Sequence, residues 1–152
     1  MTETERLLAI EEIKSVKAKY LRGVDTGDSD LVRGILAEDC VLDYNGCWVD
    51  PASGHDFMPA MNVVVHGNGS WSSALSKMGI VTVHHCHNVE LEFASDSSAS
   101  AIWSMTDRFF MPAGSEYSRL TGFGYYHETY LKIDGAWKIK TTRVARLRCE
   151  GA

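Results

Sequence analysis

Apolar residues recur every three or four positions through the first part of the chain. Those within residues 4–24 are Leu7, Leu8, Ile10, Ile13, Val16, Tyr20, Leu21 and Val24. This spacing places them on one stripe of an α-helix, so Lys14, Lys17 and Lys19 are expected on its other faces. We expect the helix to end near Thr26-Gly27-Asp28, because glycine readily adopts the left-handed conformation of a C-cap.

The pattern then changes over the middle of the chain. Ser29 is the expected N-cap of a second helix over the apolar positions Leu31, Val32, Ile35 and Leu36. The β-rich residues 40–44 and 47–49 flank Asn45-Gly46, which predicts a short hairpin. Residues 56–65 suit a third, shorter helix. Residues 66–78 are rich in Gly, Ser and Asn and predict a loop around Trp71.

The rest of the chain is typical of strands. Segments 79–94, 98–111, 119–133 and 136–148 are rich in β-branched and aromatic residues and are separated by turn-forming residues, including Asp134-Gly135. Strands joined in sequence form an antiparallel meander. Gly122 and Gly124 within one strand predict a bulge or a sharp bend, which a strongly curved sheet needs.

Helices followed by strands predict an α+β fold: N-terminal helices packed on a strongly curved, mostly antiparallel sheet of four long strands. Such a sheet wrapped against a long helix leaves a cone-shaped cavity, which is a natural site for a small molecule. The length of 152 residues suits one domain, over residues 1–152.

Composition narrows the classes of partner. The formal net charge is −5 and there is no Lys/Arg cluster, so binding to nucleic acid or to an anionic membrane is not expected. The charged start of the chain is no signal peptide, and no apolar run is long enough to span a membrane. The four cysteines form no C-x-x-C pair. We therefore expect a cytoplasmic protein with reduced thiols, although the spacing is compatible with one disulfide.

The first candidates for chemistry are Tyr20 and Asp25. Tyr20 lies on the apolar stripe of the first helix, and Asp25 follows at the helix end, where the chain can turn it back toward the interior. A buried phenol and a carboxylate near apolar walls both need polar partners. The alternative is a core tyrosine with an exposed aspartate.

The second candidate is the run Val83-His84-His85-Cys86-His87-Asn88. Strand alternation places His84 and Cys86 on one face and His85 and His87 on the other. One inward histidine could act as a general base, since histidine titrates near neutral pH. A metal site is less favoured because no second cluster with ligand spacing follows. Surface histidines are the remaining interpretation.

The third set is Asp107 and Arg146. Asp107 follows Trp103 and Met105 at every second position, so these three residues share a face. If that face lines the cavity, Asp107 needs a cation, and Arg146 on the last strand could form a bidentate pair with it. Arg143 and Arg148 compete for this role, and the alternative is a surface ion pair. Trp137 and Arg146 have opposite parity, so both point inward only if a bulge intervenes.

These motifs are similar to a known family. The chain resembles the SnoaL-like branch of the NTF2-like superfamily, whose members share a cone-shaped α+β barrel. Residues 10–25 look like the family's first helix, and residues 130–139, with Asp134-Gly135 and Trp137, look like its last hairpin. The resemblance covers roughly the whole chain and is weakest over residues 45–78. Its pattern is most similar to the bile-acid 7α-dehydratases, and more distantly to scytalone dehydratases, hexachlorocyclohexane dehydrochlorinases and ketosteroid isomerases.

The resemblance implies a set of site residues. The active-site tyrosine, first aspartate, histidine, second aspartate and late arginine of the bile-acid dehydratases fall on Tyr20, Asp25, His84, Asp107 and Arg146. It implies a lyase without metal or organic cofactor, which eliminates water from a hydrophobic carbonyl-containing polycyclic or aromatic molecule. Phe109 stands near the position of the second histidine of scytalone dehydratases, so that variant of the chemistry is not supported.

Other functions remain open on this fold. The same base could shift a proton as in ketosteroid isomerases, or the domain could bind a ligand without catalysis or serve as the small subunit of a ring-hydroxylating dioxygenase. A cavity filled by aromatic side chains would favour binding alone; a roomy cavity with His84 touching Asp25 would favour an enzyme. We also expect a homo-oligomer, a dimer or trimer, through the outer sheet face, with Phe123, Tyr125 and Trp137 as interface residues.

Overall fold

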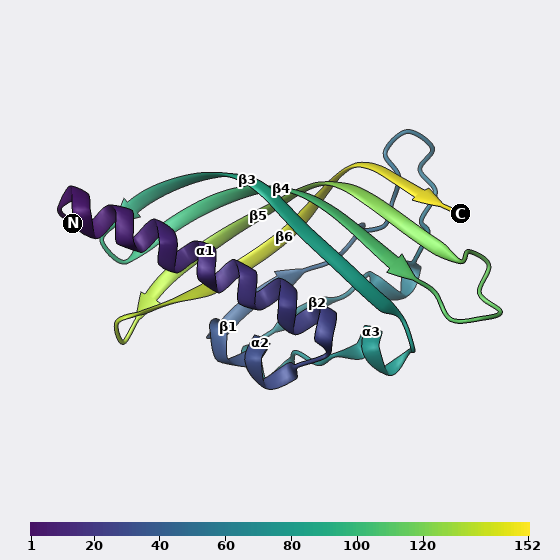
Figure 1. The fold of residues 1–152 in the computed structure, drawn as a ribbon, viewed down its shortest axis with the longest axis horizontal. Coiled ribbons are helices and arrows are strands. Elements are labelled where there is room, and N and C mark those ends of the chain that lie inside the picture. The colour runs from purple at the N-terminus through teal and green to yellow at the C-terminus, as the bar shows by residue number, and fades with distance from the viewer.

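The computed structural model describes all 152 residues. A long helix, α1 (Glu3–Thr26), lies beneath an arch of long strands (Figure 1). The Thr2 hydroxyl accepts a hydrogen bond from the Glu5 amide, and the Glu5 carboxylate accepts one from the Thr2 amide, so a capping box starts the helix. Gly27 ends it with φ of 68°, which confirms the predicted C-cap.

The second helix, α2 (Ser29–Ile35), starts one residue earlier than predicted. Its N-cap is Asp28, whose carboxylate accepts a hydrogen bond from the Leu31 amide at 3.0 Å, and not Ser29. The Ser29 hydroxyl instead lies 3.2 Å from the Ser73 hydroxyl. Leu36 does not continue the helix; it begins the first strand.

The predicted antiparallel meander of four long strands is confirmed. It consists of β3 (Val81–Ser95), β4 (Ser98–Phe110), β5 (Arg119–Ile133) and β6 (Ala136–Gly151). The sheet has two further strands that the sequence did not predict in this form, β1 (Leu36–Asp43) and β2 (Val64–His66), in the order β2-β1-β6-β5-β4-β3. β1 runs parallel to β6, and the other neighbours are antiparallel.

The predicted hairpin over residues 40–49 is wrong. β1 pairs with β2 and β6, and after Tyr44 the chain forms successive tight turns, with the Cys47 amide bonded to the Tyr44 carbonyl. Only Val49 makes an isolated bridge, to Asp56. The reason is tertiary: Cys47 and Trp48 are buried, so the segment turns inward instead of returning along β1.

The predicted helix over residues 56–65 is also wrong. This stretch contains a single 3₁₀ turn, η1 (Pro59–Met61), followed by β2. The Asn62 side chain holds the segment open, since it accepts from the Gly46 amide and donates to the Asp56 carboxylate. The predicted loop over residues 66–78 includes the 3₁₀ turn η2 (Asn68–Ser70) and the one-turn helix α3 (Ala74–Lys77), with Trp71 buried between them.

Two bulges set the direction of the side chains on β6. Its pairing with β5 shifts between Ile139 and Thr141 and again between Arg146 and Arg148, so that Lys140 and Leu147 have no partner. The first bulge adds one residue between Trp137 and Arg146, which strict alternation would place on opposite faces of the sheet. Trp137 and Arg146 therefore both face inward, and the bend predicted from Gly122 and Gly124 lies opposite the second bulge.

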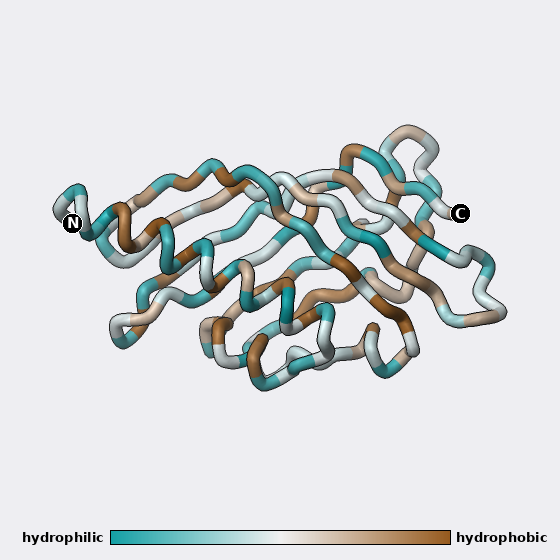
Figure 2. The backbone as a smooth tube through the Cα atoms, in the orientation of Figure 1, coloured by the Kyte–Doolittle hydropathy of each residue, from teal (hydrophilic) through white to brown (hydrophobic).

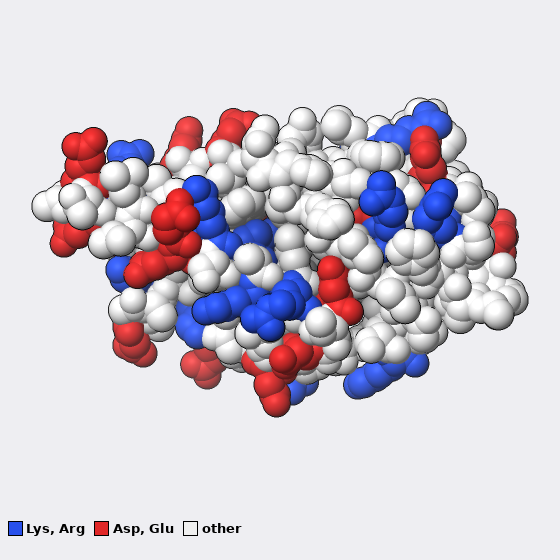
Figure 3. All heavy atoms as spheres, viewed as in Figure 1, with Lys and Arg blue, Asp and Glu red and all other residues white.

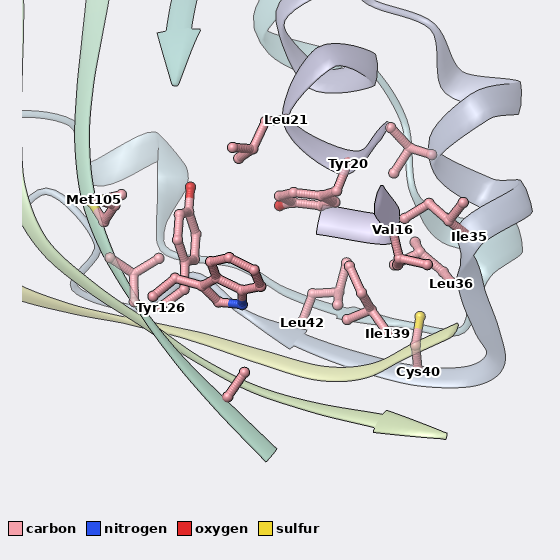
Figure 4. Close-up of a cluster of buried hydrophobic side chains, with 14 of the residues drawn as sticks. Val16, Tyr20, Leu21, Ile35, Leu36, Cys40, Leu42, Met105, Tyr126 and Ile139 are labelled. Atoms are coloured by element: carbon pink, nitrogen blue, oxygen red, sulfur yellow. The ribbon is translucent and has the colours of Figure 1, made fainter. Parts of the chain in front are cut away.

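One apolar core fills the space between α1 and the sheet (Figure 4). Figure 2 shows hydrophobic and hydrophilic residues interspersed along the long strands, as expected for a sheet with one buried face. Trp137 belongs to this core and packs edge-on against Phe93, so its predicted place on the outer face is wrong.

Charged side chains of both signs are interspersed over the face that carries the helices (Figure 3). All four cysteines are free thiols. None of the helices combines the length and the apolar character that crossing a bilayer requires.

Candidate active site

The inner face of the sheet, the end of α1 and the segment between residues 44 and 76 enclose a cavity of about 290 Å³. Fourteen of its 21 lining residues are hydrophobic, which suits an apolar ligand. Aromatic side chains form much of the wall: Tyr20, Tyr44, Trp48, Trp71, Phe109 and Tyr126. Three polar groups reach it from β3, β4 and β6, namely His84, Asp107 and Arg146.

His84 and Asp25 are in direct contact. Nδ1 of His84 lies 2.5 Å from Oδ1 of Asp25, which also accepts a hydrogen bond from the Thr82 hydroxyl at 2.9 Å. Oδ2 of Asp25 accepts a bond from the His84 backbone amide at 3.0 Å. The last turn of α1 thus presents the carboxylate to the start of β3. The carboxylate favours the tautomer with its proton on Nδ1, which leaves the Nε2 lone pair free.

Nε2 of His84 faces the cavity. Its nearest charged neighbour is Oδ2 of Asp107 at 3.8 Å, which is beyond hydrogen-bond distance. The imidazole packs edge-on against Phe109, with ring centroids 5.6 Å apart. Since only 8% of the His84 side chain is exposed, Nε2 is a fixed acceptor that a ligand in the cavity could meet.

Asp107 and Arg146 form a buried bidentate pair. The Arg146 guanidinium donates to the two carboxylate oxygens of Asp107 at 2.9 and 3.0 Å. It also donates to the Cys47 carbonyl and lies 4.6 Å from the centroid of the Trp48 ring. Burial lowers the pKa of Arg146, but the charge and hydrogen bonds of Asp107 outweigh it and leave the pKa raised. The guanidinium stays charged, and the pair places a fixed dipole on the cavity wall.

Gly122 makes room for this ion pair. A β-carbon at this position would lie 2.5 Å from the Asp107 carboxylate and would overlap the Arg146 guanidinium. At Gly124 a β-carbon would meet the Ala145 carbonyl of β6. The two glycines therefore allow a close approach of strands and of the ion pair, in addition to the bend that the sequence indicated.

The Tyr20 hydroxyl reaches the cavity together with that of Tyr44, at an oxygen-to-oxygen distance of 2.5 Å. Burial raises the pKa of both phenols, so both remain protonated and the pair can present a hydrogen-bond donor to a ligand. Sequence reasoning missed Tyr44, because the predicted hairpin gave it no particular role. Its aromatic character alone was no sufficient signal.

A second missed feature is a buried ion pair behind the cavity wall. Lys17, predicted on a polar face of the first helix, is 1% exposed, and its ammonium lies 2.6 Å from the Glu128 carboxylate. Glu128 also accepts hydrogen bonds from Thr142 and Tyr130. The signal was present in the spacing: Lys17 follows Ile13 by four residues and precedes Tyr20 by three, so it lies on the apolar stripe.

The competing candidates lie elsewhere. His85 and His87 are exposed, and His87 lies 3.4 Å from the Thr106 hydroxyl. Arg143 is exposed, and Arg148 pairs with Glu150 at the surface. No group of three or more His, Cys, Asp or Glu side chains has an arrangement that could hold a metal ion.

A shallow groove lies between the end of α1 and the start of β3, on the side of the His84–Asp25 pair that faces away from the cavity. Its lining includes Arg22, Asp25, His85 and Cys86. His84 is the one residue that lines both this groove and the cavity. Asp25 lines the groove but not the cavity, and 24% of its side chain is exposed. The imidazole thus separates two spaces.

Comparison with known proteins gives a family and a fold. The model of the SnoaL-like domain matches residues 5–143. A solved structure of a scytalone dehydratase candidate from Novosphingobium aromaticivorans has a TM-score of 0.77 at 21% identity, covering 100% of this chain and 92% of that one. A type 2 hexachlorocyclohexane dehydrochlorinase has a TM-score of 0.76 at 17% identity, covering 99% and 93%. A protein of unknown function from Mycobacterium tuberculosis has a TM-score of 0.73 at 19% identity, covering 96% and 76%.

Proposed function

The chain belongs to the SnoaL-like domain family of the NTF2-like superfamily, and on this basis we propose that it is a cofactor-independent lyase. The substrate is a hydrophobic polycyclic or aromatic molecule with a carbonyl group, from which general acid–base catalysis eliminates water. The observation that carries this proposal is the 2.5 Å contact of His84 Nδ1 with Asp25, combined with a free Nε2 at the cavity. The names of two similar structures, a dehydratase candidate and a dehydrochlorinase, both denote eliminations.

In the proposed reaction His84 is the general base. Its Nε2 takes a proton from the carbon next to the carbonyl, and the electron pair of that C–H bond forms an enolate. Asp25 holds the ring and stabilises the imidazolium that results. Tyr20, paired with Tyr44, donates a hydrogen bond to the enolate oxygen, where negative charge develops.

The second half of the reaction expels the hydroxyl group. As the enolate returns to a carbonyl, its electrons form the new C=C bond and the bond from the β-carbon to oxygen breaks. The leaving hydroxyl takes a proton from the imidazolium and departs as water. Asp107 lies 3.8 Å from the imidazole, and Arg146 holds it by two hydrogen bonds. The pair orders the polar side of the cavity around the leaving group.

The cavity also bears on the non-catalytic alternative. An interior filled by aromatic side chains would have favoured binding alone. The interior instead leaves about 290 Å³ free beside a histidine that touches a carboxylate. The buried Asp107–Arg146 pair is costly for a domain that only binds or assembles, and it lies beside a histidine oriented by a carboxylate, which supports an enzyme.

The test is turnover of a panel of cyclic β-hydroxyketones, followed by mass spectrometry. Loss of water supports elimination, whereas conversion of a cyclic β,γ-unsaturated ketone, assayed in parallel, to its conjugated isomer at unchanged mass would instead identify a proton-shifting isomerase. His84→Ala is expected to lower the rate by about 10²–10⁴-fold with folding intact, and Asp25→Asn to lower it through the wrong tautomer. His85→Ala, next along β3 but outward-facing, is the matched control. Undiminished turnover by His84→Ala would remove His84 as the base.

We also propose that copies associate through the outer face of β4–β6. Phe123 and Tyr125 lie there, both half-buried, and aromatic residues are enriched at interface cores. Replacing Tyr125 by Glu is expected to yield monomers in light scattering. A monomeric unmodified chain would contradict this assembly.

A further inference from the structure

Tyr126 carries a buried hydroxyl that the mechanism above does not use. Its side chain comes from the middle of β5, the residue is 3% exposed, and it lines the cavity. The other fully buried phenols have polar partners: Tyr20 pairs with Tyr44, and Tyr130 bonds to Glu128 and to Trp103. Tyr126 has no hydrogen-bond partner in the protein, although buried hydroxyls usually find one.

The hydroxyl nevertheless is not sealed off. Among side-chain nitrogen and oxygen atoms, only the indole nitrogen of Trp137 is both fully buried and without a hydrogen-bond partner. The Tyr126 oxygen also has no partner, so it is not fully buried, and the space that it reaches is the cavity. Figure 4 shows the ring standing away from the sheet with its oxygen at the far end. A ligand in the cavity is the partner that the geometry leaves available.

The ring is held rigidly by the groups behind it. The Lys17 ammonium lies 3.4 Å from the centroid of the Tyr126 ring, and the Tyr20 ring meets Tyr126 edge-on at 6.5 Å. Lys17 in turn is fixed by its contact with Glu128. A cation over the ring face draws electron density from the phenol, which strengthens the hydroxyl as a donor.

The protonation state agrees with a donor role. Burial, and next the negative charge of Asp107, raise the pKa of Tyr126 well above its ordinary range. The phenol therefore keeps its proton at neutral pH and is available as a hydrogen-bond donor to an oxygen atom.

We propose, resting on the function proposed above, that Tyr126 is a substrate-binding residue whose hydroxyl donates a hydrogen bond to a carbonyl or hydroxyl oxygen of the ring system in the cavity. This contact selects oxygenated ring compounds over hydrocarbons of the same shape. A site built to hydrogen-bond an oxygen rejects the analogue that lacks it, because the protein group is then left unpaired. Lys17 is a positioning residue, since it acts through the Tyr126 ring.

The experiment compares two probes of one shape. Binding of 1-tetralone and of its hydrocarbon counterpart tetralin to the full chain is followed by the fluorescence of Trp48 and Trp71, which line the cavity. We expect the unmodified protein to bind the ketone at least 10-fold more tightly than the hydrocarbon. Tyr126→Phe should lose about 10-fold in affinity for the ketone and none for the hydrocarbon. Tyr125→Phe, the neighbouring phenol on the opposite face of β5, should change neither.

A second measurement starts from the unmodified protein. The carbonyl stretching frequency of bound 1-tetralone should be lower than in hexane, and Tyr126→Phe should raise it. An unchanged ketone preference or frequency in Tyr126→Phe overturns the proposal, and so does a lack of ketone binding to the unmodified protein. Because neither measurement requires turnover, failure here is distinguishable from failure of the His84 chemistry, which the His84→Ala assay tests.

Discussion

Replacing Lys17 by methionine removes one half of a buried ion pair and keeps an unbranched side chain that is one atom shorter. At the observed separation of 2.6 Å, two opposite charges attract by about 6 kcal/mol at an effective dielectric constant of about 20. Much of this attraction offsets the cost of taking both charges out of water. The single substitution leaves Glu128, which is 0% exposed in its side chain, charged and without a cation. We expect the free energy of unfolding to fall by about 3–5 kcal/mol.

Equilibrium unfolding in guanidinium chloride, followed by tryptophan fluorescence, measures this loss as a lower midpoint at unchanged slope. The double variant Lys17→Met/Glu128→Gln should recover at least about 2 kcal/mol, because no charge stays buried. The Thr142 and Tyr130 hydroxyls bond to different oxygens of Glu128; the amide oxygen of glutamine can accept from one of them, and the amide NH2 can donate to the oxygen of the other. Lys14→Met breaks the exposed pair with Glu11 on the same helix and should cost no more than about 1 kcal/mol. A single variant as stable as Lys14→Met, or a double variant weaker than the single one, would refute the reasoning.

Three further changes test other parts of the structure. Gly122→Ala drives a methyl group into the Asp107–Arg146 pair and should cost about 3 kcal/mol in guanidinium unfolding, whereas Gly34→Ala, with open space around its β-carbon, should cost nothing. Gly27→Ala forces alanine to φ of 68° against Ser76 and should lower the thermal midpoint more than Gly54→Ala, which adds only the backbone strain of about 1–2 kcal/mol. Burial raises the pKa of the thiols from 9.0 to about 12 in Cys47 and to about 11 in Cys86 and Cys149. Their contribution to stability is complete below pH 9 and decreases as pH rises toward 11–12, so the free energy of unfolding from guanidinium titrations should be lower at pH 10 than at pH 8, by about 1 kcal/mol for each thiol.

Local signals in the sequence were strong where local rules decide the structure. The stripe from Leu7 to Val24 and the cap at Gly27 predicted α1 to within a few residues. Asp134 and Gly135 have φ of 50° and 80°, as a tight hairpin turn requires. The parity of Trp137 and Arg146 predicted that both face inward only if a bulge intervenes, and the structure has this bulge near Lys140.

The middle of the chain followed tertiary contacts instead. The apolar residues Phe57, Met58 and Met61 repeat at helical spacing, yet they pack against the core or line the cavity from an irregular segment. No local pattern in the sequence predicts the parallel pairing of β1 with β6, which joins residues about 100 positions apart. Such long-range pairing is where propensity carries least information.

The candidate site likewise includes residues that the sequence indicated and residues whose place only tertiary contacts explain. Alternation grouped His84 with Cys86, and Asp107 with Trp103 and Met105, because a strand sends every second side chain to the same face. The choice of His84 over His85 and His87 came from the family resemblance, because alternation alone did not decide which face is inward. Lys17 was assigned to the solvent because lysine usually lies there, and only its partner Glu128, on β5, explains its burial. When a charged residue falls on the apolar stripe of a helix, a residue of opposite charge on a facing strand should therefore be considered as its partner before the residue is assigned to the surface.

The position of His84 between the cavity and the outer groove has a consequence for isotope labels. In the proposed reaction the abstracted proton sits on Nε2, which faces the cavity, whereas the groove meets the ring on the side of Nδ1 and Asp25. While substrate fills the cavity, this proton is therefore shielded from bulk water. Deuterium placed on the acidic carbon should then be retained in unreacted substrate instead of exchanging with the solvent.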